Sequence, residues 1–236
     1  VITNPPFSLF REFIVWLTGS NVKFVVLGNM NAITYKEVFP LLKEVKIWLG
    51  TNYRVNGGAM FYEIPEAIAN LDQVREIRTN EAGKKVFITR VQGVRWFTNL
   101  DHGRRHEPLS LMTQEENLKF NNAVKDIGYQ KYDNYDAIEV PRVDAIPSDY
   151  DGVMGVPISF LDKYSPDQFV LLGASQSWDS SSGLKTQTYP KQIQVMSNGA
   201  ESEVTKLNDA PAIESTASPS STHYRVGGKV YESTYK

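Results

Sequence analysis

Residues 1–13, "VITNPPFSLFREF", join three local patterns that decide the fold of the first part of the chain. Residues 1–3 are typical of the end of a buried strand. The NPPF motif at residues 4–7 cannot continue that strand, because proline lacks a backbone N–H. Ser8 is a favourable helix N-cap. The apolar residues that follow are spaced as on one face of a helix, namely Phe10, Phe13, Ile14 and Leu17.

Two more apolar segments extend this pattern along the chain. Residues 22–27 (VKFVVL) and 45–49 (VKIWL) indicate strands, and Thr34 with Glu37 has the spacing of a capping box before a second helix. Alternating strands and helices predict an α/β fold with a parallel sheet. Ligands bind at the carboxyl ends of the strands in such sheets, so residues 4–7 are a candidate site.

The rest of the chain gives weaker signals. Strands are predicted at residues 59–64, 86–91, 94–98 and 168–172, and helices at 66–78 and 114–127. Residues 179–222 are dominated by polar and small residues, and we expect a flexible low-complexity segment there. Residues 223–236 are predicted to form a terminal hairpin around Gly227-Gly228.

Composition excludes several classes of site. The 236 residues carry a formal net charge of −2, so any basic DNA-binding surface must be local. The chain has no cysteine, which excludes disulfides and thiolate metal sites and is consistent with a cytoplasmic location. With three scattered histidines, we expect no metal site. No apolar run reaches the roughly 18 residues that span a bilayer, so no membrane partner is expected.

The NPPF motif suits one kind of chemistry. The lone pair of an exocyclic amine on a nucleobase is delocalised into the ring, so this amine is a poor nucleophile. Two acceptors placed along its N–H bonds stabilise the positive charge that develops during attack. The side-chain oxygen of Asn4 is one acceptor, and a rigid backbone carbonyl near Pro5 and Pro6 is the second, while Phe7 can stack on the base. The alternative interpretation is a purely structural turn with two prolines and a core phenylalanine.

Longer strings carry a resemblance to a known family. NPPF resembles motif IV of amino-methyltransferases. Together with the following strings it resembles the EcoRI-type adenine-specific DNA methyltransferase family over roughly residues 1–175: "ITNPPFSLFREF", "LGNMNAITYKEVFPLLKEVKIWLG", "WFTNLDHGRR", "YDNYDAIEV" and "DYDGVMGVPISFLDKYSPDQFVLLG". The resemblance implies a partial Rossmann-like class I methyltransferase sheet, in an α/β fold with an appended DNA-recognition region. It also implies S-adenosyl-L-methionine as cofactor, double-stranded DNA as substrate and a restriction–modification setting.

The resemblance also implies a domain organisation. Residues 1–64 are expected to be the catalytic half of the α/β domain, and residues 65–178 the remainder of the core and the DNA-recognition region. The family binds its cofactor with a glycine-rich turn before the catalytic motif, and no such turn precedes Val1. We therefore expect the cofactor-binding part to be missing, the fragment to be inactive alone, and its exposed sheet edge to allow self-association.

Candidate DNA contacts lie in the segment 75–106, which has eight Lys and Arg against three Asp and Glu. Basic residues that can contact phosphates and aromatic residues that can contact the flipped base make up the predicted set: Arg90, Arg95, Trp96, Phe97, His102, Arg104 and Arg105. Asn29 and Asn31 have two possible roles, binding in the cofactor or base pocket and turn formation. The segment that contains Asn134 and Tyr135 either contacts DNA or forms a structural corner, and we favour the structural corner.

The leading hypothesis is methyl transfer to the 6-amino group of a flipped adenine. A second hypothesis changes the acceptor to an RNA guanine or a protein glutamine, since NPPF is also found in those enzymes. A third is a DNA-binding remnant without catalysis. The cofactor-contacting residues are not predicted.

Overall fold

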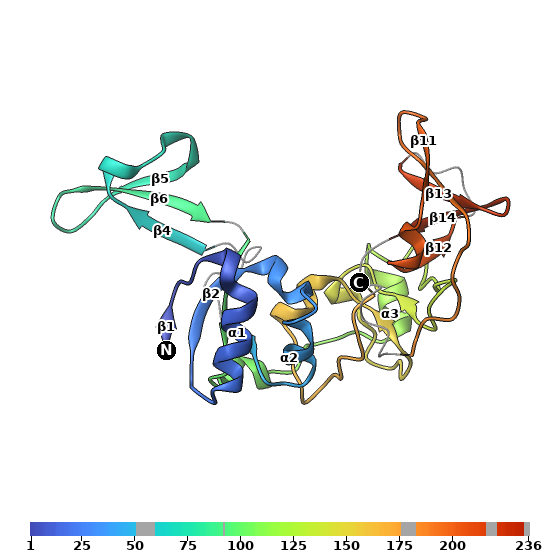
Figure 1. Ribbon diagram of the computed structural model, residues 1–236, viewed down its shortest axis with the longest axis horizontal. Helices are drawn as coiled ribbons and strands as arrows, with labels where there is room; N and C mark the ends of the chain where they lie inside the picture. The colour runs from blue at the N-terminus through green and yellow to red at the C-terminus, as the bar shows by residue number, and fades with distance from the viewer. Residues whose placement is uncertain (51–59, 92, 176–182, 216–220, 234–236) are drawn as a thin grey trace. The chain divides into compact units, whose positions relative to one another are not determined.

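The computed structural model describes residues 1–50, 60–91, 93–175, 183–215 and 221–233 (Figure 1). The chain divides into two compact units, Val1–Arg104 and Arg105–Lys236, which we call the N-terminal unit and the C-terminal unit. The domain boundary predicted at residue 64 therefore falls inside the N-terminal unit. Both units combine short helices with small sheets, so the chain is a mixed α/β protein.

The main sheet of the N-terminal unit has the strand order β1-β2-β7-β3. Its strands are β1 (Ile2–Thr3), β2 (Val25–Asn29), β7 (Val94–Thr98) and β3 (Trp48–Leu49). β1 and β2 are parallel, as predicted, whereas β7 is antiparallel to both of its neighbours. The prediction of a parallel sheet is therefore only partly correct, because β7 returns from later in the chain and separates β2 from β3. The burial predicted for residues 1–3 is wrong, because β1 is an edge strand, and Val1 before it is 53% exposed and Ile2 within it 82% exposed.

Side chains after β7 hold this strand in place. The Thr98 hydroxyl donates a hydrogen bond to the Phe24 carbonyl over 2.6 Å. The Asn99 side chain accepts from the Phe24 N–H over 3.0 Å and donates to the Val22 carbonyl over 2.8 Å. These bonds fix the end of β7 beside the residues that lead into β2.

Helix α1 (Phe10–Gly19) follows the NPPF motif, as predicted. Its apolar stripe is buried at Phe10, Ile14 and Leu17. The predicted N-cap is wrong, because Ser8 lies within a 3₁₀ turn, η1 (Phe7–Leu9), and its side chain makes no cap hydrogen bond. The prolines thus lead into a 3₁₀ turn before the helix begins.

Helix α1 packs on the sheet at Gly28 in β2. A Cβ atom on Gly28 would lie 2.5 Å from Cε2 of Phe10 and 2.9 Å from Cε2 of Phe97. The Phe10 and Phe97 rings contact each other with centroids 4.9 Å apart. Gly28 is therefore required for close packing, since any side chain would occupy the space of these rings.

The segment between β2 and β3 contains a 3₁₀ helix, η2 (Met30–Thr34), and a short helix, α2 (Phe39–Lys43). The capping box predicted at Thr34 is wrong. The Thr34 hydroxyl instead donates to the Asn31 carbonyl over 2.8 Å, and Pro40 occupies the first turn of α2.

A separate three-stranded sheet with the order β4-β6-β5 belongs to the N-terminal unit. Its strands are β4 (Met60–Ile64), β5 (Val74–Thr79) and β6 (Lys85–Val91). The predicted strands here are confirmed, but the helix predicted at 66–78 is wrong. Two 3₁₀ turns, η3 (Glu66–Ile68) and η4 (Leu71–Gln73), precede β5 instead. Pairing of Ile77 with Phe87 overrides the helical pattern, as tertiary contacts often do.

The C-terminal unit has two clusters of buried residues. The first cluster contains Val124, Ile138, Val140, Val143, Ala145, Ile146 and Phe160. The first part of the C-terminal unit contains α3 (Gln114–Phe120), β8 (Ile138–Glu139), η6 (Val143–Ala145), β9 (Met154–Gly155) and η7 (Ile158–Asp162), and the 3₁₀ turn η5 (Gly103–His106) crosses the unit boundary. Helix α3 begins at a capping box between Thr113 and Glu116, but it ends before the predicted residue 127. The predicted strand at 168–172 is not formed.

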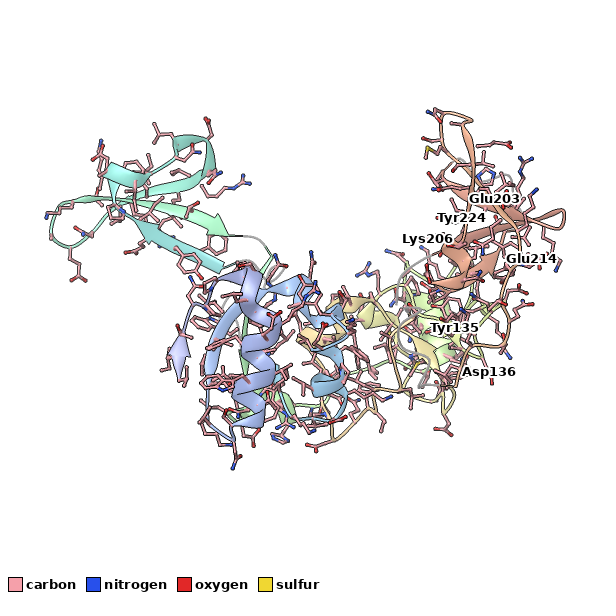
Figure 2. All side chains as sticks on the ribbon, in the orientation of Figure 1. Tyr135, Asp136, Glu203, Lys206, Glu214 and Tyr224 are labelled. Atoms are coloured by element: carbon pink, nitrogen blue, oxygen red, sulfur yellow. The ribbon has the colours of Figure 1, made fainter. Side chains whose placement is uncertain are left out.

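The second cluster lies on a five-stranded antiparallel sheet with the order β11-β10-β13-β14-β12. Its strands are β10 (Gln192–Val195), β11 (Glu201–Val204), β12 (Ala212–Glu214), β13 (His223–Val226) and β14 (Lys229–Ser233), and η8 (Lys206–Asn208) lies between β11 and β12. Figure 2 labels Glu203, Glu214 and Tyr224 on this sheet. The hairpin predicted around Gly227-Gly228 is confirmed as β13 and β14.

The flexible segment predicted at residues 179–222 is wrong for residues 183–215, which contain three of these strands. Polar side chains take part in the core of this sheet. Gln192 is fully buried, accepts from the Leu207 N–H over 2.8 Å and donates to the Tyr189 carbonyl over 3.2 Å. A polar composition therefore did not prevent folding, because both ends of the buried Gln192 amide find backbone partners. Residues 176–182 and 216–220 lie outside the described residues.

Two polar residues connect the two clusters of the C-terminal unit. Asn134 is fully buried and donates to the carbonyls of Leu207 and Ala210 over 2.8 and 3.0 Å, while its oxygen accepts from the Ala212 N–H. The Asp133 carboxylate accepts a 2.6 Å hydrogen bond from the Tyr189 hydroxyl. The structural interpretation of Asn134 is therefore confirmed.

Gly28→Ala should lower the free energy of unfolding by about 1–3 kcal/mol, because the new methyl group overlaps the Phe10 ring. Denaturant unfolding measures this change. Gly19→Ala is the matched control, since no atom lies within 4 Å of a Cβ at that position. Equal stability of the two variants would contradict the packing described for Gly28.

The C-terminal unit should lose stability as the pH rises above 10. Burial, followed by the hydrogen bond to Asp133, raises the pKa of Tyr189, and burial raises the pKa of Tyr129 to about 12. A raised pKa in the folded state stabilises the protein below pH 10, and this stabilisation is lost as the pH rises through the folded-state value. Urea unfolding at pH 8 and pH 11 measures the difference.

Tyr189→Phe tests the same linkage. Loss of the hydroxyl should cost about 1–2 kcal/mol at pH 8 and should reduce the further loss at pH 11. A variant with the wild-type pH dependence would show that Tyr189 does not contribute to it.

Candidate functional site

The NPPF motif lies directly after β1, where the chain leaves the sheet. The parallel register pairs Thr3 of β1 with Val26 of β2, so both strands run toward the same edge, and β2 continues three residues beyond this pair to Asn29. The edge beyond parallel strands is where ligands bind in α/β folds. Asn4, Pro6 and Phe7 are exposed there, and Pro5 is buried.

Backbone geometry differs between the two prolines. The Pro6 carbonyl accepts a hydrogen bond from the Leu9 N–H over 3.0 Å, which ties it to the 3₁₀ turn. The Pro5 carbonyl accepts no hydrogen bond within the described part of the chain. Pro5 therefore provides an available acceptor next to Asn4, held by a buried ring. Phe7 remains 43% exposed and is accessible for stacking.

The end of β2 contributes a second polar turn at this edge. The Asn29 side-chain oxygen accepts from the Asn31 N–H over 2.8 Å and caps η2. Turn formation thus accounts for the Asn29 oxygen, while the exposed Asn31 side chain keeps a binding role as a hypothesis.

An interaction that the sequence did not predict joins the segments that follow the two strands. The Arg11 guanidinium lies 4.1 Å from the ring centroid of Tyr35. Arg11 is in the first turn of α1, and Tyr35 follows η2. Such a cation–π contact contributes about 0.5–1 kcal/mol at an exposed site. No sequence spacing could have revealed it, since the two residues lie on different elements.

The structure changes the predicted set of DNA contacts at β7. Phe97 has no exposed surface and packs on Phe10, which leaves its ring no surface for a DNA contact in this arrangement. Arg95 is 3% exposed, and a guanidinium so covered cannot reach a phosphate. Trp96 is half-buried, and its Cβ would lie 2.9 Å from a Cβ on Gly50. Arg90 lies on β6, and its side chain is outside the described part of the structure.

His102 has a structural role in this geometry. Its Nε2 lies 3.1 Å from the Leu49 carbonyl, to which a ring N–H donates. Its Nδ1 is buried without a partner. One nitrogen is bonded and the other is covered, which favours a structural role, and the DNA contact of His102 stays a prediction. Arg104 is exposed and Arg105 is half-buried.

The charge of the three-stranded sheet is balanced. Residues 60–91 carry five Lys and Arg and five Asp and Glu. Arg78 makes a bidentate ion pair with Glu76 at 2.7 and 2.8 Å. Exposed Lys84 and Lys85, at the turn between β5 and β6, make no ion pair within the described residues. At this sheet, the side chains of Lys84 and Lys85 are therefore basic groups that remain available to bind an anion.

Neither metal ligands nor membrane spans emerge from the described residues. They contain no group of three or more His, Asp or Glu side chains placed to hold a metal ion. Among them there is also no helix with the length and apolar character needed to cross a bilayer.

Comparison with known proteins identifies the family. A family model described as "Adenine-specific methyltransferase EcoRI" matches residues 1–214. The chain belongs to this EcoRI-type methyltransferase family. The match extends beyond the resemblance found in the sequence and includes strands β10, β11 and β12 of the C-terminal unit.

Three relatives of this EcoRI-type chain are curated as Type II methyltransferases. M.EcoRI of Escherichia coli is 44% identical over 73% of this chain and 49% of its own length. M.MpnI of Mycoplasma pneumoniae is 35% identical over 80% and 56%, respectively, and M.MgeORF184P of Mycoplasma genitalium is 37% identical over 81% and 57%. The chain thus spans about half the length of these relatives. No solved structure matched it.

Proposed function

We propose that this chain carries the catalytic motif and DNA contacts of an S-adenosylmethionine-dependent methyltransferase. Its substrate is the 6-amino group of an adenine flipped out of duplex DNA, in a restriction–modification setting. The supporting observation is the exposed NPPF motif at the carboxyl end of β1, next to the parallel strand β2, in a member of the EcoRI-type family. We further propose that the β1-β2-β7-β3 sheet is the catalytic half of a Rossmann-like sheet.

The proposed chemistry uses two acceptors on one amine. The Asn4 side-chain oxygen accepts from one N–H of the adenine amine, and the Pro5 carbonyl accepts from the other. These contacts favour a tetrahedral nitrogen whose lone pair points out of the ring plane. They also stabilise the positive charge that grows on nitrogen as the new C–N bond forms, which lowers the barrier without an ionised base.

Phe7 holds the base in plane. An exposed aromatic ring next to the acceptors can stack on the adenine face, as aromatic pockets do for flipped bases. The buried Pro5 ring and the packing of α1 on Gly28 keep the motif rigid. Little reorganisation is then needed when the base arrives.

The described residues provide only part of a binding site for S-adenosylmethionine. The edge beyond β1 and β2 leaves the acceptors exposed, but the described residues contain no glycine-rich turn between a strand and a helix. Gly28 cannot supply one, since the Phe10 and Phe97 rings cover it. S-adenosylmethionine supplies the methyl group in the proposal, and no residue of this chain is assigned to its binding.

The proposed phosphate contacts come mainly from basic side chains of the N-terminal unit that make no ion pair. Arg104 is exposed and makes no ion pair within the described residues. The N-terminal unit has thirteen Lys and Arg against nine Asp and Glu, whereas the C-terminal unit has twelve against eighteen. DNA should therefore be attracted mainly by the N-terminal unit. Arg105 and Trp96 remain proposed contacts.

Asn4→Ala in the complete gene product should lower turnover about 10²- to 10³-fold, because one preorganised acceptor is lost. Single-turnover methylation of a duplex that contains the recognition site measures the rate, and fluorescence anisotropy measures DNA affinity, which should stay near that of the wild type. An unchanged rate would refute the mechanism.

Ser8→Ala is the matched control for this variant. Ser8 is exposed near the motif and its side chain makes no cap hydrogen bond, so turnover should not change. If the wild-type protein methylates RNA or protein but not duplex DNA, the acceptor in the proposal is wrong while the role of Asn4 can stand.

Arg104→Ala should weaken binding equally for specific and unrelated duplexes. Loss of one phosphate contact should reduce the slope of log K against log salt by about 1. A salt titration measures the slope. Arg142→Ala is the control, because Arg142 is already paired with Asp144 at 2.6 Å in the acidic unit. Equal slopes for wild type and Arg104→Ala would exclude this phosphate contact.

A further inference from the structure

Residues 169–173, FVLLG, have the pattern of a strand but no partner strand. Val170, Leu171, Leu172 and Gly173 make no hydrogen bond within the described part of the chain. Burial alternates along the segment. Phe169 and Leu171 pack against the first core cluster, whereas Val170 is 79% exposed and Leu172 40% exposed. Alternation with a period of two is the arrangement of a strand, so the segment has the side-chain order of a strand and unused backbone groups.

The same segment lines a cavity of about 380 Å³ in the C-terminal unit. Strand β9 also lines this cavity. The carbonyls of Val153 and Gly155 accept from the N–H groups of Ile138 in β8 and of Val140, which directly follows β8. Successive backbone groups of a strand point to opposite edges, so those of Met154 face away from β8. The backbone of residues 170–173, which makes no hydrogen bond within the described structure, and the outer edge of β9 therefore line the same cavity.

The cavity is apolar with one charge. Val156, Phe160, Phe169 and Leu171 are among its lining side chains, and Asp151 is the only charged residue among those that line it in the described structure. Tyr135, labelled in Figure 2, also lines it, and its hydroxyl donates to the Ser175 carbonyl over 3.4 Å. With Asp151 in the wall and an excess of acidic residues in this unit, the charge disfavours DNA and favours a cationic occupant.

We propose that the C-terminal unit binds an extended basic peptide segment of another protein by strand addition. The peptide pairs with the backbone of residues 170–173, places alternate apolar side chains in the cavity and sets a Lys or Arg near Asp151. A row of consecutive backbone donors and acceptors suits a strand better than a small molecule. The inference does not depend on the methyl transfer proposed above, and it gives the C-terminal unit a protein partner.

Fluorescent ten-residue peptides test the proposal against the complete gene product. A peptide of alternating Val and Lys should bind, as measured by anisotropy, and the same peptide with Glu in place of Lys should not. Two further versions of the Val–Lys peptide carry N-methyl groups on alternate residues, in the two possible registers. One register should bind about tenfold more weakly, because it lacks the N–H groups that pair with residues 170–173, and the other should bind normally.

Matched charge variants test the contribution of the cavity wall. Asp151→Asn should weaken binding of the Val–Lys peptide about three- to tenfold, as loss of one charge partner does. Asp126→Asn removes an exposed charge of the same unit outside the cavity lining and should leave binding unchanged.

Three results would overturn the proposal. One is the absence of peptide binding up to about 1 mM, which is weaker than a functional contact requires. Another is equal weakening by both N-methyl registers or by both Asp variants, which indicates nonspecific attraction. The third is a concentration-dependent dimer in sedimentation that the peptide dissociates, since the occupant is then a second copy of the chain.

Discussion

The missing side chain at Gly28 is the constraint on which the N-terminal unit depends. Because β2 has no Cβ at this position, the Phe10 ring can contact both the strand and Phe97 of β7. This contact joins a helix, a parallel strand and an antiparallel strand at one point. Helix α1 follows the NPPF motif after one 3₁₀ turn, so the position of Asn4 relative to the end of β2 depends on the same packing.

The position of β7 connects the proposed catalytic edge to the three-stranded sheet. β7 lies between β2 and β3 in the main sheet, although the chain forms β4, β5 and β6 after β3 and before β7. The three-stranded sheet is therefore an insertion between two strands that pair with each other. Thr98 and Asn99 bind the backbone before β2, so the return of the chain from this insertion is held by hydrogen bonds.

The C-terminal unit uses polar contacts where a larger core would use apolar ones. Asn134 satisfies three backbone groups of the 207–212 segment, and Asp133 accepts from Tyr189. A buried amide with all its partners costs little and specifies one arrangement, since a shifted chain would leave these groups unpaired. The C-terminal unit has an excess of acidic residues and an unpaired strand segment, whereas the N-terminal unit has an excess of basic residues. We therefore expect the two units to bind different partners.

Patterns within short stretches of the sequence were enough to predict the strongly periodic elements and the candidate motif. The strand before NPPF, the helix through Leu17 and the hairpin at Gly227-Gly228 follow from patterns that neighbouring residues carry. They could not determine which distant strands pair. The last part of the helix expected at 66–78 lies in strand β5 instead, because β6 offers backbone partners. The 183–215 segment folded because its polar groups find partners far away in the chain. Phe97 was predicted at DNA because a one-dimensional pattern cannot separate a surface aromatic residue from one that packs beneath a helix. Only the tertiary structure decided that, since burial depends on which elements pack together.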